Sequence, residues 1–429
     1  LGFLGCVFCH SPGHTDKSTD LCLASKTIFR NCHKLNSYMR KFAFPFVGVL
    51  LLLLTACQTG QPETNNNTLT PTSSPGDGRD YQYFVLPNQL QVLVISDPAT
   101  EKAAVSLNVQ VGSKDDPGDR EGLAHFLEHM LFLGTERYPD AGEYQDFLTA
   151  QGGSHNAYTS FETTNYFFDI QAQALAPALD RFSGFFTSPL FTAAYVDREK
   201  NAVESEYRSK LKDESRRALD ALKEVVNPAH PFAKFTVGSL ETLTDREDSL
   251  VRDELLEFYD KYYSADRMTL VILGTESIAQ LRAMAEQYFT AVPRRKAVED
   301  AIDEPLFVEG TLPAEVMITP EQNLRRLRLA YPVPETRSEW AAKPMHMMAD
   351  IIGHEGEGSL LQELKREGLA EGLSAGLSFE YKGGALFNIS INLTEKGFKQ
   401  RDRVIESVYQ AVARLRTEGI SRQRFEEQA

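Results

Sequence analysis

The sequence predicts an α+β fold made of two similar α/β units. Strand-like and helix-like hydrophobic patterns alternate along residues 80–295, and a charged stretch at 296–311 interrupts them. The same kind of alternation resumes over 312–429. With 42% hydrophobic and 24% charged residues, the composition is typical of a globular protein rather than of a disordered or multi-span membrane protein.

The first predicted unit, residues 80–295, interleaves strands with helices. Alternating hydrophobicity predicts strands at 103–111, 164–170 and 268–273. Apolar residues at helical spacing predict helices at 121–133, 140–151, 174–187, 193–222 and 276–288. No glycine-rich phosphate loop follows the first strand, so the pattern gives no support to nucleotide chemistry.

The second predicted unit, residues 312–429, repeats this organisation after the linker at 296–311. Strands are predicted near 314–319, 325–331, 373–380 and 385–392, and helices near 338–352, near 357–367 and from about 396. This unit has roughly half the length of the first. Because two units of one kind are expected to be similar in size, we expect the second to be incomplete.

The charge balance excludes one class of partner. The chain has 60 acidic and 45 basic residues, which gives a formal net charge of −15. Proteins that bind nucleic acids present basic faces to the phosphates. We therefore expect no nucleic-acid partner.

All five cysteines lie within the first 57 residues. The predicted folded units therefore have no disulfide framework, no thiolate metal site and no cysteine nucleophile. Any metal ion in these units has to be held by histidines and carboxylates.

The N-terminal residues predict export of a lipoprotein. The chain does not begin with methionine, and its first methionine is Met39, so residues 1–38 are expected to be upstream sequence assigned to the chain in error. Residues 39–57 combine two basic residues with an apolar run that is too short to span a bilayer but is typical of a signal peptide. The run ends in Leu-Thr-Ala-Cys at Cys57, which resembles the bacterial lipobox; an ordinary secretory signal is the alternative.

Residues 58–79 are rich in Thr, Asn, Pro, Gly and Ser and predict a flexible tether. We expect the mature protein to be lipidated at Cys57 and thus to be anchored to a bacterial membrane. We expect that membrane to be the outer membrane and the protein to lie on its periplasmic side. The tether would hold a soluble domain away from the bilayer.

Residues 125–129 read His-Phe-Leu-Glu-His, and this motif predicts the chemistry. On a helix, His125 and His129 lie on one face about 6 Å apart, which suits two imidazoles on one metal ion. Glu128 shares that face. An apolar stripe on the opposite face is predicted to pack on a sheet, and it consists of Leu123, Phe126, Leu127, Met130 and Leu131.

A catalytic zinc site needs a third protein ligand and an open position for water. The predicted helix at 193–222 offers Glu199 and Glu206, which are two turns apart and therefore on one face. Glu204 is an alternative acid that points elsewhere. Spacing alone does not choose among these glutamates, because most glutamates on helices are simply solvated.

The H-x-x-E-H order is the inverzincin signature, and the sequence around it resembles the pitrilysin/insulinase (insulysin) family of zinc metallopeptidases. The matching segments are Gly122 to Gly134, 152–159, Glu199 to Glu206, 227–232 and 353–360. The similarity covers about residues 80–429. It implies two-layer α/β units, each a mainly antiparallel sheet packed with helices, in halves that close around a chamber.

The resemblance implies a role for each matched residue of the metal centre. His125, His129 and Glu206 match the ligands of one zinc ion per chain. Glu128 matches the general base that deprotonates a zinc-activated water. Glu199 matches a carboxylate that hydrogen-bonds a ligand histidine, as metal sites generally require.

The resemblance also implies a substrate site. Asn156 and Ala157 match a strand whose backbone pairs with an extended peptide substrate. Phe132 and Tyr158 lie where the family places side-chain pocket residues, although aromatic residues there are equally compatible with a core.

The function predicted from these residues is that of a zinc metalloendopeptidase acting on peptides. One alternative is a non-catalytic or partner-dependent subunit of the same fold, with a binding or assembly role; the complete set of matched residues argues against it. Another is a lipid-anchored structural protein with a fortuitous motif. The family also uses an Arg and a Tyr from its C-terminal half, and nothing in this chain matches them. We therefore expect the chain alone to be weakly active or inactive, and a missing C-terminal half or partner subunit to restore activity.

Overall fold

The computed structural model of the chain describes residues 2–6, 68–295, 297 and 299–428. The predicted signal peptide, Cys57 and most of the predicted tether lie outside these residues, so lipid attachment stays a prediction. Among the residues described, no helix is both long enough and apolar enough to cross a membrane.

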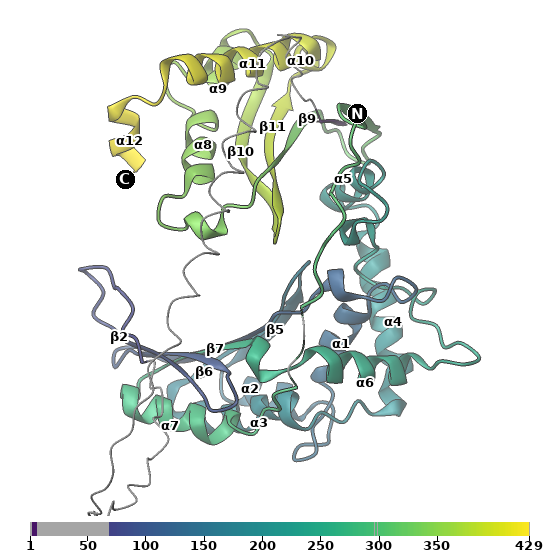
Figure 1. Cartoon of the computed structure of the whole chain (residues 1–429), viewed down its shortest axis with the longest axis vertical. Coiled ribbons are helices and arrows are strands. Elements are labelled where there is room, and N and C mark those ends of the chain that lie inside the picture. Colours follow the sequence, from purple (N-terminus) through teal and green to yellow (C-terminus); the bar gives the residue numbers. More distant parts are fainter. Residues whose placement is uncertain (1, 7–67, 296, 298, 429) are drawn as a thin grey trace, which may run out of the picture. The chain divides into compact units, whose positions relative to one another are not determined.

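Six strands form the first sheet, in the order β2-β3-β7-β4-β6-β5 (Figure 1). The strands are β2 (Asp80–Val85), β3 (Gln91–Ser96), β4 (Lys102–Val109), β5 (Ser154–Thr159), β6 (Thr164–Gln171) and β7 (Met268–Gly274). All neighbouring pairs are antiparallel except β3 and β7, which are parallel. Strand β5 is at the edge of the sheet and pairs with β6 on one side.

Helices cover one face of this sheet (Figure 1). They are α1 (Leu123–Leu131), α2 (Glu143–Ala150), α3 (Leu175–Thr187), α6 (Val251–Tyr262) and α7 (Ile278–Phe289). Two further helices, α4 (Ala193–Lys210) and α5 (Glu214–Lys223), follow α3 in the sequence.

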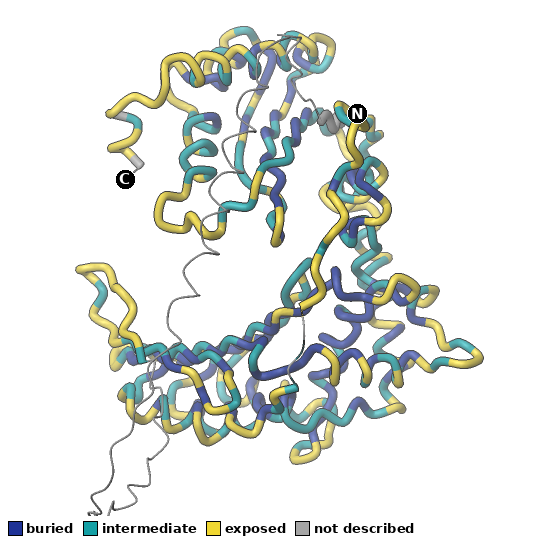
Figure 2. The backbone as a smooth tube through the Cα atoms, viewed as in Figure 1, coloured by how far each residue is buried: buried dark blue, intermediate teal, exposed yellow. Residues whose placement is uncertain are grey.

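Alternation along the strands builds the core between the sheet and the helices. In β7, Met268, Leu270 and Ile272 are buried, and the residues between them are half-buried. Full burial of such a side chain contributes roughly 1.5–3 kcal/mol. Figure 2 shows the buried parts of the chain concentrated along these strands and the helices packed on them.

The second sheet has five strands in the order β10-β11-β9-β1-β8. Their bounds are β1 (Gly2–Cys6), β8 (Ala314–Ile318), β9 (Arg326–Val333), β10 (Ala370–Tyr381) and β11 (Gly384–Leu393). The pairs are antiparallel except β1 with β9. Its helices are α8 (Pro344–Ile352), α9 (Leu360–Arg366), α10 (Glu395–Lys399), α11 (Arg401–Glu418) and α12 (Arg422–Gln428). A second core joins α9 and α11 to this sheet through residues such as Leu364, Val404 and Ile391.

The predicted fold class, mainly antiparallel sheets packed with helices, is confirmed, but some elements differ from the prediction. The predicted helix at 193–222 is two helices, α4 and α5. Asp213 caps the start of α5, because its side chain accepts hydrogen bonds from the backbone N–H groups of Ser215 and Arg216. The predicted helix at 338–352 begins only at Pro344, which occupies its first turn. Strands β2 and β3 and helix α6 were not among the predicted elements.

Candidate metal centre

Helix α1 carries the H-x-x-E-H motif, and a buried carboxylate fixes its start. The backbone N–H groups of Gly122 and Ala124 donate to Asp116 at 2.8 and 2.7 Å. These are groups that have no partner within the helix, so Asp116 caps it from outside. Gly122 has φ 88°, and an added Cβ would lie 2.3 Å from the backbone of Gly238, so only glycine fits there.

The two faces of α1 are separated as the sequence predicts. All five residues of the predicted apolar stripe are buried: Leu123, Phe126, Leu127, Met130 and Leu131. The side chains of His125 and His129 are 15% and 24% exposed. Their ring centroids lie 4.8 Å apart, so both imidazoles occupy the face that is not packed on the core.

Glu206 of α4 lies against both imidazoles. Its Oε2 is 3.6 Å from Nε2 of His125 and 3.6 Å from Nε2 of His129. One possible ligand atom from each of the three residues lies within 4.8 Å of the other two. Ligands at zinc's usual bond lengths stand about 3.3 Å apart in a tetrahedron, so these three donors fit a zinc ion.

The remaining ring nitrogens of the two histidines have partners that orient them. Nδ1 of His125 lies 2.6 Å from the carbonyl oxygen of Val237, to which it donates as an N–H group. Nδ1 of His129 lies 3.4 Å from Oε2 of Glu199. A proton on Nδ1 in each ring would leave Nε2, the nitrogen that faces Glu206, to bind a metal ion, which is the tautomer that a metal ligand needs.

The electrostatics of the centre favour a bound cation. Burial lowers the pKa of His125. Burial also opposes charge on His129, but the neighbouring carboxylates of Glu199 and Glu206 outweigh that effect and raise its pKa to about 9. The imidazole of His129, 3.6 Å away, holds the pKa of Glu206 far below its usual range. Two carboxylates thus converge on positive charge at this point.

Glu128 is the remaining polar residue of the motif. It is only 7% exposed, and this burial raises the pKa of its carboxyl group. Oγ1 of Thr159, the last residue of β5, donates to its Oε2 at 2.5 Å. A desolvated and oriented carboxylate of raised pKa is suited to general-base chemistry.

The other glutamate that spacing left open does not reach the centre. Glu204 accepts hydrogen bonds from the backbone N–H of Leu240 at 2.9 Å and from Arg208. Glu206, in contrast, pairs through its second oxygen with Lys210, one turn along α4. The geometry therefore separates Glu206 from Glu204, as sequence spacing could not.

A groove of about 460 Å³ lies beside the centre. Its lining includes Glu128, His129, Phe132, His155, Asn156, Ala157 and Glu199. The structure thus brings Phe132, Asn156 and Ala157 together with the centre. Tyr158 does not line this groove and is 52% exposed. Phe132 also packs on the rings of Tyr144 and Phe185, so it belongs partly to the core.

Three contacts of the centre were not predicted from the sequence. Val237 acts through its backbone carbonyl, which leaves no side-chain signal. Asp116 caps a helix that starts several residues later in the sequence, beyond the spacing of ordinary caps. Thr159 lies in the segment that matches the family, but that match gave it no role.

Two family models match the chain, each over one part of it. The model described as "Insulinase (Peptidase family M16)" matches residues 91–237, and the model described as "Peptidase M16 inactive domain" matches residues 249–429. The chain belongs to the M16, or pitrilysin/insulinase, family. The resemblance inferred from the motifs is therefore confirmed.

This M16 chain is similar to much longer relatives. It is 41% identical over 343 residues to the A-factor-processing enzyme of Saccharomyces cerevisiae, covering 79% of this chain and 33% of that protein. It is 40% identical over 359 residues to the insulin-degrading enzyme of Homo sapiens, covering 83% and 35%. The crystal structure of pitrilysin matches with a TM-score of 0.78 and 32% identity, covering 84% of this chain and 39% of that one. The chain spans about a third of the length of the curated relatives it matches.

Proposed function

We propose that this chain forms the catalytic centre of a zinc-dependent metalloendopeptidase. The observation that supports this most directly is the convergence of His125, His129 and Glu206 beside the buried carboxylate of Glu128. Membership of a peptidase family supports the same reaction class. A bound zinc ion would lower the pKa of a water molecule and polarise the scissile carbonyl.

The chain's own residues perform the proton transfers. Glu128 accepts the proton that the attacking water loses and returns it to the leaving nitrogen. Thr159 holds the carboxylate in position through its hydrogen bond to Oε2. Proton transfer by a positioned carboxylate contributes about 10²–10⁴-fold to such reactions.

The substrate in this proposal is an extended peptide. Strand β5 is the edge of its sheet, so the side not paired with β6 can add another strand. Asn156 and Ala157 lie on this strand and line the groove next to Glu128. The backbone of a peptide added there would pair with β5, and its scissile bond would lie beside Glu128.

Glu199 has a supporting role. Its position 3.4 Å from Nδ1 of His129 would orient that imidazole toward the metal. Lipid attachment at Cys57, a periplasmic location, and a C-terminal half or partner subunit that completes the site are proposals that rest on the sequence alone.

The proposal is tested by a Glu128→Gln variant of the full-length protein. We expect it to keep one zinc ion per chain and to lose peptide hydrolysis by at least about 100-fold, because only the proton acceptor is removed. Glu136→Gln is the matched control, because Glu136 follows α1 on the exposed surface and should leave both properties unchanged. A Glu128→Gln protein that cleaves peptides at the wild-type rate would refute the proposal.

A further inference from the structure

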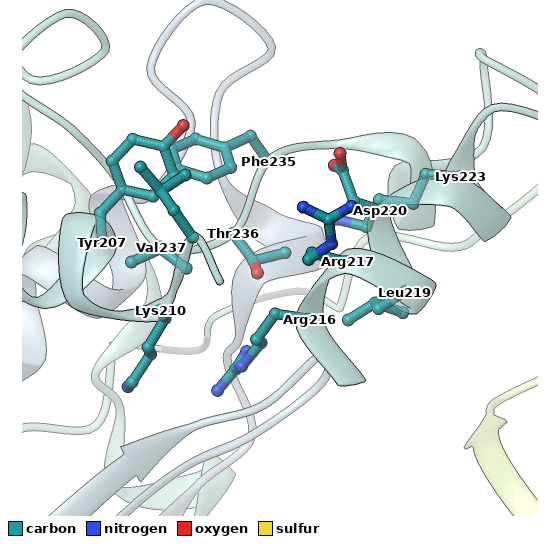
Figure 3. A pocket seen from close by; sticks show the side chains of 11 residues that line it. Tyr207, Lys210, Arg216, Arg217, Leu219, Asp220, Lys223, Phe235, Thr236 and Val237 are labelled. Carbon is teal, nitrogen blue, oxygen red and sulfur yellow. The ribbon is translucent and has the colours of Figure 1, made fainter. Parts of the chain in front are cut away.

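A second cavity lies near the metal centre and shares no lining residue with the groove along β5. It lies where α4 ends and α5 begins, and its volume is about 160 Å³, many times what one water molecule requires. We call it the basic pocket; it is lined by Tyr207, Lys210, Leu211, Arg216, Arg217, Leu219, Asp220, Lys223, Phe235, Thr236 and Val237 (Figure 3).

Two residues join the basic pocket to the ligands of the centre. Val237 accepts the hydrogen bond from Nδ1 of His125, and Lys210 pairs with Glu206. The groove, in contrast, is lined by His129 and Glu199. The groove is thus lined by the ligand His129 itself, whereas the pocket is lined by the partners of His125 and Glu206, so a peptide cleaved at the centre can place one residue in the groove and another in the pocket.

The basic pocket has an excess of positive charge. Four cationic side chains line it, Lys210, Arg216, Arg217 and Lys223, and one acidic residue, Asp220, offsets part of their charge. In Figure 3, Lys210 from α4 and Arg216 from α5 extend in the same direction. Apolar walls such as the ring pair Tyr207 and Phe235, 5.1 Å apart, lower the local dielectric and strengthen the field of these charges.

Most of these cations already have a partner. Lys210 pairs with Glu206, and Lys223 donates to the carbonyl oxygen of Lys234. Arg217 donates to Glu321 at 3.1 Å and to the carbonyl oxygen of Thr319 at 2.7 Å. No acceptor among the described residues pairs with the guanidinium group of Arg216, which is exposed. Arg216 is therefore the cation left to meet a ligand.

The start of α5 sets the position of Arg216. Oδ1 of Asp213 accepts the backbone N–H of Arg216 at 2.9 Å, which fixes the first turn of the helix. Arg216, Leu219 and Lys223 follow at helical spacing and so occupy one face. That face is the one that lines the pocket.

We propose that the basic pocket binds an acidic side chain of the peptide substrate, an aspartate or a glutamate, and that Arg216 is the residue that selects it. This inference rests on the proposed peptidase function. A guanidinium group matches a carboxylate through two parallel hydrogen bonds. The protein therefore prefers peptides with an acidic residue at one fixed position beside the scissile bond.

Peptide binding tests the proposal without requiring hydrolysis. The Glu128→Gln form of the full-length protein is titrated with short acetylated and amidated peptides, identical except that one Gln is replaced by Glu at each position in turn. We expect the Glu peptide to bind about tenfold more tightly than the Gln peptide at one position only, as expected for a hydrogen bond to a charged group. Because the termini are blocked, a terminal carboxylate cannot produce this preference.

Variants of Arg216 then assign the preference. Added to the same protein, Arg216→Gln should abolish it and Arg216→Glu should reverse it. A glutamate at the third position of α5 is favourable to the helix N-terminus, so folding should be kept. Lys212→Glu is the matched control, because it makes the same charge change at an exposed residue of the α4–α5 connection that does not line the pocket. This variant should keep the preference.

The proposal is overturned if no position favours Glu, if the peptides do not bind, or if Lys212→Glu removes the preference as fully as Arg216→Glu. A preference that persists in a protein whose wild-type form does not hydrolyse peptides would support the pocket and contradict the peptidase function. Peptide hydrolysis without a preference for an acidic residue would support the peptidase function and contradict the proposed role of the pocket.

Discussion

Thr159 and Glu128 are joined by a 2.5 Å hydrogen bond from Oγ1 to Oε2. Thr159 ends the edge strand β5, and Glu128 lies on α1, so this bond connects the strand proposed to hold the peptide with the proposed general base. The carboxylate is buried and gains orientation from this one hydroxyl. Loss of this hydroxyl is therefore expected to lower kcat.

Thr159→Val should lower kcat roughly tenfold or more, because a hydrogen bond to a charged group is worth about 1.5–3 kcal/mol. KM and zinc content should change little. Thr159→Ser keeps the hydroxyl and should restore kcat. Steady-state kinetics on the three proteins checks this; equal kcat values for Val and Ser at position 159 would mean that the hydroxyl has no role in orienting Glu128.

Glu199→Gln should weaken zinc binding about 10–100-fold, the usual cost of losing a partner of a ligand histidine. Competition with a chelator of known affinity measures the change. Glu204→Gln on the same helix is the control, because Glu204 contacts Leu240 and Arg208 instead. Equal zinc affinities for the two variants would remove Glu199 from the metal centre.

Asp116→Ala should destabilise the protein by about 2 kcal/mol, since it leaves two buried backbone N–H groups at the start of α1 without their acceptor. Chemical unfolding measures this. Asp119→Ala is the control, because Asp119 is exposed and makes a surface ion pair with Arg246, which contributes at most about 1 kcal/mol. Similar losses in both variants would contradict the capping role of Asp116.

His230 predicts a dependence of stability on pH. It is 1% exposed, and burial lowers its pKa to about 4. As the pH falls, His230 therefore becomes protonated near pH 6.5 in the unfolded chain but only near pH 4 in the folded chain. The contribution of His230 is fully present above pH 6.5 and is lost as the pH falls toward 4, by up to about 3 kcal/mol.

The variant His230→Asn isolates this contribution. Nδ1 of His230 accepts the backbone N–H of Phe232 at 3.0 Å, and an asparagine oxygen is suited to the same capping role. Unfolding free energies measured between pH 4 and pH 7 should therefore fall less steeply in the variant than in the wild type. Parallel curves would show that His230 is not buried in its neutral form.

The sequence predicted those parts of the centre that depend on spacing along one helix. The i, i+4 histidines and the opposite apolar stripe of α1 follow from the helical repeat, and so does the i, i+7 pair Glu199 and Glu206. What joins separate elements was not predictable this way. The carbonyl of Val237 has no sequence signature, and the break after Lys210, which forms the basic pocket, depends on a single capping residue, Asp213.

The zinc content of the purified full-length protein tests the central claim most directly. We predict one zinc ion per chain in the wild type and in Glu204→Gln, and almost none in Glu206→Gln or in the double variant His125→Ala, His129→Ala, with folding of each protein checked by circular dichroism. Undiminished zinc in the folded double variant would contradict the assignment of the metal centre to α1 and α4.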